Sequence, residues 1–255
     1  MQETIVYEQP LNEVIRVCLR LEQIFEQIDH QLHDSSMLAT RNVITSIIHV
    51  LQILDRPDLK AKLAKELSSH LTNLMRYDNS PQLDSQKYEQ LVNQLKGLSR
   101  DLIDSSGKIG HRLRDVELLN TLRLQLASPG GGCSFDSPVY HYWLQQPPTT
   151  RQAVIQDWIN DFSQIKTAYA LILNLVRKNA KVEQKTAVHG FHQELLDPQA
   201  NLRMIRIGIP REFAAFPETS IGRHFFSVRF FAHDIISRPT QYTQNLPFWV
   251  AYCNL

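Results

Sequence analysis

The feature that most constrains the fold is a change of hydrophobic period near Lys181. Before it, apolar residues of the segment 12–33 recur in steps of four, three, four, three and four, which is typical of one helix face. These residues are Val14, Cys18, Leu21, Phe25, Ile28 and Leu32. After it, apolar and polar residues alternate, as in 201–209, which is the period of a β-strand. The chain therefore combines a helical part with a sheet part.

The helical part contains about seven predicted helices. Asn12 is the expected cap of the first, and the prolines of Arg56-Pro57 and Ser80-Pro81 mark breaks between later ones. A short helix is expected after Ser137-Pro138, which has the pattern of an N-cap followed by a first-turn proline. The expected helices span residues 12–33, 37–55, 57–76, 82–103, 110–126, a short stretch from 138, and 150–179.

The second part predicts a small antiparallel sheet. Its β-type runs are residues 185–196, 201–209, 225–231 and 248–253. A lone strand near the N-terminus needs partners from elsewhere and can close this sheet, bringing the two ends of the chain together. The expected fold class is α+β, with a mainly helical domain at 10–183 and a β domain at 184–255 that includes the N-terminal strand 3–9.

Three consecutive glycines, Gly130, Gly131 and Gly132, lie inside a segment rich in aromatic residues. Glycine loses the most backbone entropy on folding, so three in a row indicate a close backbone approach or a positive φ. We interpret them as a structural hinge. They are not a phosphate loop, because no Gly-Lys-Ser/Thr follows.

Composition excludes several classes of function. The formal net charge is +1, so no global field attracts the chain to nucleic acid or to anionic lipid. The three cysteines are far apart, which is typical of a reducing compartment. No secretory signal is expected, and no apolar run is long enough to cross a membrane. We expect a cytoplasmic protein that binds neither nucleic acid nor membrane.

No metal or cofactor is expected, because HExxH and paired CxxC patterns are absent from the sequence. One enzymatic alternative remains open: a thiol-dependent hydrolase centred on Cys133 and His141. A catalytic thiol needs a lowered pKa and an oriented base, and the sequence shows neither. A small buried thiol is the favoured interpretation of Cys133.

Basic residues give the strongest indication of a binding site. Arg16 and Arg20 share one helical stripe, where like charges repel mildly unless an acid such as Glu13 lies between them. Cations at the start of the helix 110–126 oppose the helix dipole, so they do not serve helix stability. Together the basic residues predict a pocket for an acidic or carboxylate-bearing peptide. The predicted residues are Arg16, Arg20, Arg112, Arg114, His141 and Arg229. A nucleic-acid-binding adaptor is the alternative, disfavoured by the neutral overall charge.

Several segments resemble the ZapD family of cell division proteins, and the resemblance spans essentially the whole chain. The longest and most specific is the glycine-rich one. The matching segments are 8–22 (EQPLNEVIRVCLRLE), 41–43, 94–96, 126–144 (LASPGGGCSFDSPVYHYWL), 185–193 (KTAVHGFHQ) and 228–230.

This resemblance implies a non-enzymatic homodimer that binds the C-terminal tail of the tubulin-like protein FtsZ. It also implies that the dimer bundles FtsZ protofilaments, stabilises the Z ring at the mid-cell division site and lowers FtsZ GTPase activity. Arg16, Arg20, His141 and Arg229 stand where the family pattern has basic residues. Glu117 departs from that pattern, and Arg112 or Arg114 is the expected substitute.

Overall fold

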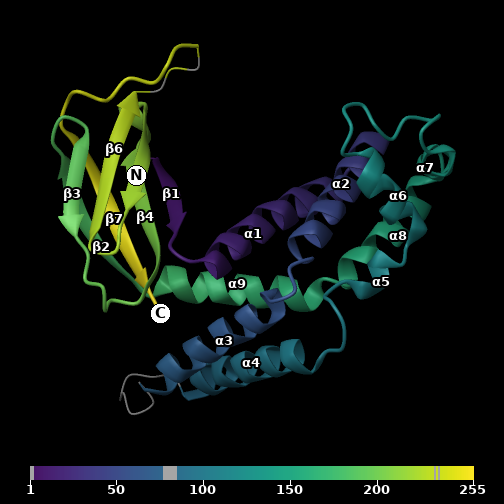
Figure 1. The fold of residues 1–255 in the computed structure, drawn as a ribbon, viewed down its shortest axis with the longest axis horizontal. Helices are drawn as coiled ribbons and strands as arrows, with labels where there is room; N and C mark the ends of the chain where they lie inside the picture. The colour runs from purple at the N-terminus through teal and green to yellow at the C-terminus, as the bar shows by residue number, and fades with distance from the viewer. Residues whose placement is uncertain (1–2, 77–84, 233, 235) are drawn as a thin grey trace. The chain divides into compact units, whose positions relative to one another are not determined.

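The computed structural model describes residues 3–76, 85–232, 234 and 236–255. The chain forms two compact units, one of Met1–Arg16 with Asn174–Leu255 and the other of Val17–Leu173. We call them the β unit and the helical unit. Both boundaries fall inside helices, α1 (Glu13–Gln31) and α9 (Ser163–Lys178) (Figure 1). The sequence-based boundaries at 10 and 183 lie instead where the residue pattern changes.

The β unit contains two antiparallel sheets, and the predicted α+β class is confirmed. One sheet has the strand order β1-β4-β7-β2 and the other β3-β6-β5. The strands are β1 (Thr4–Pro10), β2 (Ala180–Ala187), β3 (Phe191–Leu195), β4 (Leu202–Pro210), β5 (Ala215–Ile221), β6 (Phe225–Ala232) and β7 (Leu246–Asn254), with a 3-10 turn at Arg211–Phe213.

The N-terminal strand pairs inside the first sheet, as the sequence predicts. β1 runs antiparallel to β4, with Ile5 opposite Ile209. β7 pairs with the other edge of β4, so the strands from the two ends of the chain flank one central strand. Glu8 of β1 also accepts hydrogen bonds from Arg177 at 2.7 and 2.9 Å and forms an ion pair with Arg206 at 2.9 Å.

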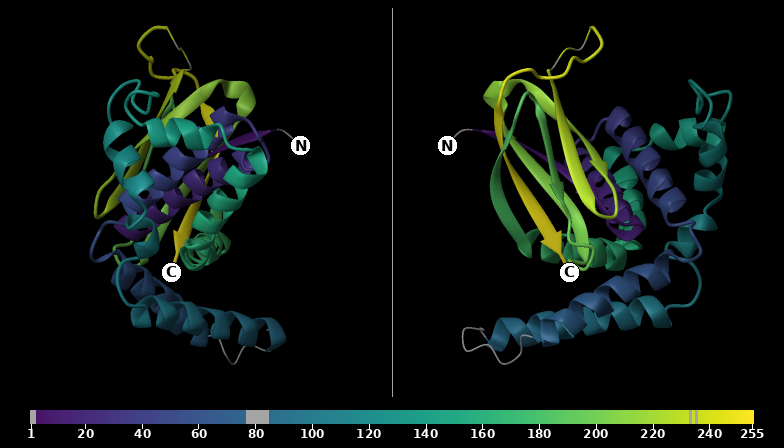
Figure 2. Two further views of the ribbon diagram at one scale, coloured as in Figure 1. Left: turned by 90° about the vertical axis from the view of Figure 1, so that its right-hand side faces the viewer. Right: turned by 60° about the vertical axis from the view of Figure 1, so that its left-hand side comes forward.

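The two sheets lie face to face (Figure 2), and the core between them is apolar. The rings of Phe230 and Phe248, from different sheets, have centroids 5.0 Å apart. The buried core residues are Ala187, Ile205, Ile207, Ile209, Ala215, Phe226, Val228, Phe230, Leu246, Phe248 and Val250.

The sequence pattern missed one strand and merged two others. The pattern did not predict β5 because Pro217 interrupts it. Proline is tolerated there because β5 is an edge strand. The run 185–196 is the end of β2 and all of β3, which turn at Gly190, whose φ is 70°.

Nine helices occur within the described residues. Besides α1 and α9 they are α2 (Met37–Ile53), α3 (Leu59–Met75), α4 (Ser85–Asp104), α5 (His111–Arg114), α6 (Glu117–Gln125), α7 (Pro138–Leu144) and α8 (Pro148–Asn160). The sequence predicts about seven because it joins α5 to α6 and α8 to α9. The extended backbone of Val116, with ψ of 106°, separates the first pair, and a turn at Asp161–Phe162 separates the second. Positions 82–84 of the expected fourth helix, and the Ser80-Pro81 break, lie outside the described residues.

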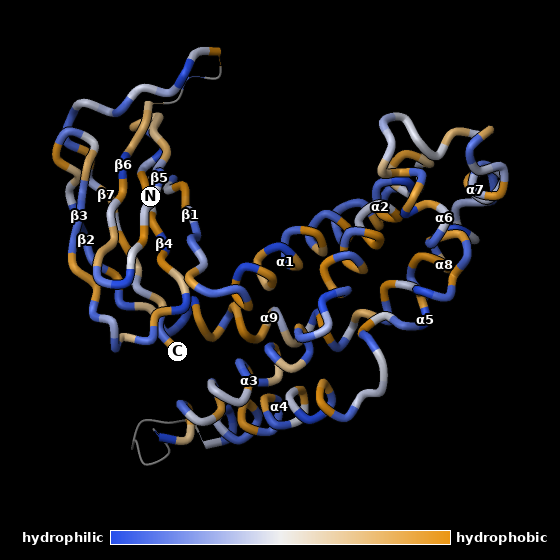
Figure 3. The backbone as a smooth tube through the Cα atoms, viewed as in Figure 1, coloured by the Kyte–Doolittle hydropathy of each residue, from blue (hydrophilic) through white to orange (hydrophobic). Residues whose placement is uncertain are grey.

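The helices begin and pack largely as their patterns predict. The Asn12 side chain accepts a hydrogen bond from the Ile15 amide at 2.8 Å, which confirms the predicted cap of α1. The apolar stripe of α1 is buried, and Phe25 packs its ring against Phe162 and Tyr169, with centroids 5.9 and 5.7 Å apart. Figure 3 shows hydrophobic and hydrophilic residues alternating along α4, as expected of an amphipathic helix.

The glycine triplet connects α6 to α7 inside the helical unit. Gly130 and Gly132 have φ of 74° and 79°, and a Cβ on Gly131 would lie 1.9 Å from the Gln125 carbonyl oxygen. The expected backbone geometry is therefore confirmed, while the role as a hinge stays a prediction. Arg41 of α2 ties this loop down by donating to the Gly132 carbonyl at 3.1 Å.

Candidate protein-binding site

The predicted basic residues are divided between the two units. Arg16 and Arg229 belong to the β unit, and Arg20, Arg112, Arg114 and His141 belong to the helical unit. Each unit therefore presents its own set of cations. Within these sets, some side chains already form an ion pair with a carboxylate. Others are exposed and have no carboxylate partner among the described residues, and we call these open cations.

Arg16 and Arg20 differ although they are one turn apart on α1. Arg16 donates to the Glu13 carboxylate at 2.5 Å, the internal partner that the spacing predicts. Arg20 is exposed and has no ion pair with any residue that the structure describes. Its guanidinium is free to read a carboxylate bidentately.

Arg229 is an exposed cation of the β unit. It lies on β6, the central strand of its sheet, where its neighbours in register are Phe191 of β3 and Glu218 of β5. The guanidinium carbon lies 5.6 Å from the centroid of the Phe191 ring, within the range of a cation–π contact. This contact orients the side chain without neutralising its charge, and the residue remains exposed.

Arg112 joins α5 to α8 through two carboxylates. It donates from Nε and Nη2 to Asp161 at 2.8 to 3.0 Å, and from Nη1 to Asp157 at 2.8 Å. These hydrogen bonds, first to Asp161 and then to Asp157, raise the pKa of the Arg112 guanidinium. The side chain is half exposed, but its donors are largely occupied.

Arg114 belongs to a cation-rich cluster around Asp55. Its side chain is only 19% exposed, and the guanidinium contacts the Asp55 carboxylate. The same carboxylate also pairs with Arg123 at 2.9 Å and Lys108 at 3.8 Å. Three cations thus share one carboxylate, and the cluster is locally positive. Sequence reasoning missed Arg123 because its partner, Asp55, lies far away in the chain, in the turn after α2.

Glu117, the residue that departs from the family pattern, begins α6. It is exposed and accepts a 3.4 Å hydrogen bond from the Thr121 hydroxyl. A carboxylate at this position is favourable for the helix dipole. Its local role is therefore explained by α6, while Arg112 and Arg114 are held by other carboxylates.

His141 lies in the last turn of α7 and is exposed. The segment 135–142 also carries three exposed apolar side chains, Phe135, Val139 and Tyr142, which are 82, 69 and 70% exposed. Tyr140 anchors α7 in the helical unit, because its side chain is buried and its ring centroid lies 5.7 Å from the Arg41 guanidinium carbon. An imidazole ring and exposed apolar groups in one short segment suit recognition of a peptide with apolar and acidic residues.

The geometry around Cys133 does not resemble a catalytic thiol. Its Sγ donates to the Gly130 carbonyl at 2.9 Å, and its amide donates to Asp136 at 3.4 Å. No hydrogen bond joins it to His141 in the described part of the chain. Burial raises the pKa of the other two thiols, that of Cys253 to about 11 and that of Cys18 further still.

Neither a metal site nor a membrane span is found among the residues that the structure describes. Over these ranges no group of three or more His, Cys, Asp or Glu side chains is placed to hold a metal ion. None of the helices described is both long and apolar enough to span a membrane.

Comparison with known proteins identifies the family. The family model described as ZapD, cell division protein, matches residues 19–229. The chain belongs to the ZapD family of cell division proteins. The ZapD protein of Methylococcus capsulatus is 34% identical over 100% of this chain and 100% of its own length. That of Nitrosomonas europaea is 33% identical over 98% of this chain and 95% of its own length. That of Coxiella burnetii is 32% identical over 99% of this chain and 98% of its own length.

ZapD membership confirms the resemblance read from the glycine-rich and N-terminal segments. The ZapD family is a family of non-enzymatic cell division proteins. Membership therefore excludes the thiol-dependent hydrolase, in agreement with the hydrogen bonding of Cys133. It leaves the basic residues as the candidates for partner binding.

Proposed function

We propose that this protein binds the C-terminal tail of FtsZ and, as a homodimer, cross-links FtsZ protofilaments into bundles. Bundling would stabilise the Z ring at mid-cell in the cytoplasm and lower the GTPase activity of FtsZ. The observation that carries the proposal is membership of the ZapD family over the full length of the chain.

The open cations support the choice of binding residues. Arg20 and Arg229 are exposed arginines without a carboxylate partner among the residues described, and His141 is exposed in a segment that carries three exposed apolar side chains. Arg16 retains partial exposure beside Glu13. Arg112 and Arg114 stay in the proposed set, although a structural role explains both.

Valency supplies the physical reason for a dimer. A tail contact that is weak alone becomes effective when one molecule holds two tails that belong to a polymer, because the second binding event is then intramolecular. Two-fold symmetry duplicates one site per subunit without any further residue.

Co-sedimentation with polymerised FtsZ tests the binding site. Replacing Arg16 and Arg20 by Ala should weaken co-sedimentation by roughly tenfold or more, since a charge-assisted hydrogen bond contributes about 1.5–3 kcal/mol. The matched control is Arg100→Ala, because Arg100 is an exposed helical arginine outside the predicted set. Equal binding by the double variant and the wild type would refute the assignment.

Size-exclusion chromatography with multi-angle light scattering tests the dimer separately. The wild type should elute at about twice the 29.5 kDa chain mass, and the Arg16→Ala, Arg20→Ala variant should do the same. A monomer at working concentration would end the cross-linking model even if tail binding survived. A wild-type protein that binds the FtsZ tail but does not increase the light scattering of polymerised FtsZ would likewise contradict cross-linking.

A further inference from the structure

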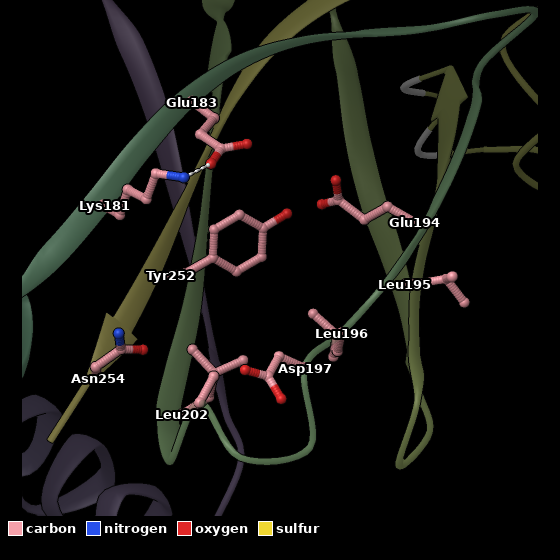
Figure 4. A pocket seen from close by; sticks show the side chains of 10 residues that line it. Lys181, Glu183, Glu194, Leu195, Leu196, Asp197, Leu202, Tyr252 and Asn254 are labelled. Atoms are coloured by element: carbon pink, nitrogen blue, oxygen red, sulfur yellow. Dashed lines mark ion pairs between the residues drawn. The ribbon is translucent and has the colours of Figure 1, made fainter.

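The β unit contains a pocket that the proposed tail-binding residues do not use. Its volume is about 290 Å³, and it opens beside β2, β3, β4 and β7 (Figure 4). This size is near the lower end for small-ligand pockets, so it suits a single side chain or a small amine. The lining residues are Lys181, Glu183, Glu194, Leu195, Leu196, Asp197, Ala200, Leu202, Tyr252 and Asn254.

Three polar atoms of this pocket are buried without a hydrogen-bond partner in the described structure. They are Oε1 of Glu194, the hydroxyl of Tyr252 and Oδ1 of Asn254. Leaving such an atom unpaired costs about 1–3 kcal/mol. The three come from two strands, β3 and β7, and all of them are able to accept a hydrogen bond. In Figure 4 the Tyr252 hydroxyl and the Glu194 carboxylate point into the same space, while Asn254 lies on the other side of the Tyr252 ring, so a single donor group would contact the first two.

The charges of the pocket also favour a cation. Glu194 uses its other oxygen, Oε2, to bind Lys185 at 2.8 Å, and Glu183 binds Lys181 at 2.6 Å and Lys185 at 2.8 Å. Asp197 adds a third carboxylate. Two lysines and His192, whose Nε2 lies 3.6 Å from Glu194 Oε2, thus face three carboxylates, and both lysines are already paired. In Figure 4 the Tyr252 hydroxyl points into the space between Glu183 and Glu194.

The remaining wall is apolar. Leu195, Leu196 and Leu202 line the pocket together with the ring of Tyr252. Leu195 is 85% exposed, so its side chain forms part of the rim. An acidic interior with an aliphatic rim matches a charged head on a methylene stem.

We propose that this pocket binds the ammonium or guanidinium end of a basic group, supplied by a lysine or arginine side chain of a peptide or by a free diamine. Glu194 Oε1 compensates the charge, the Tyr252 hydroxyl accepts a further hydrogen bond, and the leucines contact the stem. The site is opposite in sign to the proposed tail-binding residues and does not rest on that proposal.

The first test is a titration of the ¹⁵N-labelled full-length protein followed by NMR. The probes are Nα-acetyl-lysine methylamide, Nα-acetyl-arginine methylamide and putrescine, and the uncharged control is Nα-acetyl-norleucine methylamide. The charged probes should shift backbone amides of β3 and β7, and norleucine should not. Tighter binding of the blocked amino acids than of putrescine indicates a peptide side chain, and the reverse indicates a free amine.

Variants then test the named atoms. Tyr252→Phe should leave the melting temperature of the free protein unchanged or raise it, since the hydroxyl has no partner, while weakening amine binding about 2- to 10-fold. Glu194→Gln should weaken it more, by roughly 10-fold or more, because a charged group is removed. Glu218→Gln, an exposed glutamate on β5, is the matched control and should bind normally.

Three results would overturn the proposal. Absence of amide shifts at millimolar amine would mean that water alone satisfies these atoms. Equal shifts with norleucine would mean that the pocket recognises only the apolar stem. Unchanged affinity in both Tyr252→Phe and Glu194→Gln would place amine binding elsewhere on the protein.

Discussion

Arginine serves two purposes in this chain, and its neighbours decide which. Arg112 is bound by carboxylates at the end of α8 and Arg114 by a carboxylate in the turn after α2, so they connect elements of the helical unit. Arg20 and Arg229 are exposed and keep their charge open. The same residue type therefore contributes to stability at two positions and is suited to recognition at two others.

Substitution separates these two uses. Arg114→Ala should lower the free energy of unfolding by about 2 kcal/mol, because it leaves the partly buried Asp55 carboxylate with fewer partners. Arg20→Ala should change the free energy of unfolding by less than about 0.5 kcal/mol, as is usual for exposed sites. Urea unfolding of both variants checks this. Similar losses in the two would contradict the division.

Glu183 gives a residue-scale prediction on pH. Hydrogen bonds from Lys181 and Lys185 lower the pKa of its carboxyl to about 2. Because the folded pKa is depressed, the stabilisation is complete above the ordinary pKa of about 4.5 and is lost as pH falls toward 2. An NMR titration of the Glu183 carboxyl should have its midpoint near the lower value, and Lys181→Met with Lys185→Met should move it upward. A midpoint near 4.5 in the wild type would refute the ion pairs.

At the scale of elements, short connections are as constrained as the helices they join. The turn between α6 and α7 uses positive φ at Gly130 and Gly132 and a close backbone approach at Gly131. Arg41 and the Cys133 thiol add hydrogen bonds to carbonyls of the same turn. These contacts hold α7, and with it His141, against the helical unit.

Alanine substitutions test this turn against a neutral site. Gly131→Ala should destabilise the protein by about 1–3 kcal/mol, because its Cβ meets a backbone oxygen that cannot move freely. Gly97→Ala, inside α4 with no atom within 4 Å of the new Cβ, should stabilise by up to about 1 kcal/mol through helix propensity. Thermal unfolding followed by circular dichroism compares the two. An unchanged melting temperature in Gly131→Ala would show that the turn can accommodate a Cβ at this position.

Strand assignments show where local pattern succeeds and fails. β4 and β6 follow from alternation, because one face of each is buried in the sandwich core. β5 does not, because Pro217 is a strand breaker except at an edge, and edges are defined only after the strands have paired. The breaks after α5 and α8 likewise lack a glycine or proline to mark them.

At the scale of the whole molecule, a net charge of +1 means that recognition depends on local clusters rather than on a global field. Open arginines occur in both units, alongside paired ones. Electrostatic attraction from such clusters extends over roughly one Debye length, about 10 Å at 0.1 M salt.

Salt dependence follows from this distribution. Raising sodium chloride from about 0.05 to 0.3 M should weaken FtsZ co-sedimentation several-fold, because exposed charges are screened. The homodimer mass should not change over the same range if apolar burial holds the dimer together. Sedimentation assays with wild type and Arg229→Ala measure the difference, and the variant should show a shallower dependence. Salt-independent binding would argue against arginine-based recognition.

The candidate site was only partly predictable from the sequence. The pairing of Arg16 with Glu13 follows from a spacing of three residues on one helix. The pairing of Asp55 with Arg114 and Arg123 does not, since these residues are far apart in the chain and meet only when α2, α5 and α6 pack. The unpartnered acceptors of the β-unit pocket are equally invisible to local pattern.

The sequence by itself determined the order of the helical and β parts, the pairing need of the N-terminal strand and the family, because period and motif are local properties of a chain. Only the tertiary structure decided which arginines are already paired, how the sheets divide, and that Glu194, Tyr252 and Asn254 line one pocket. The physical reason is that ion pairs, burial and cavities depend on which distant segments pack together, and that packing is a property of the folded chain as a whole.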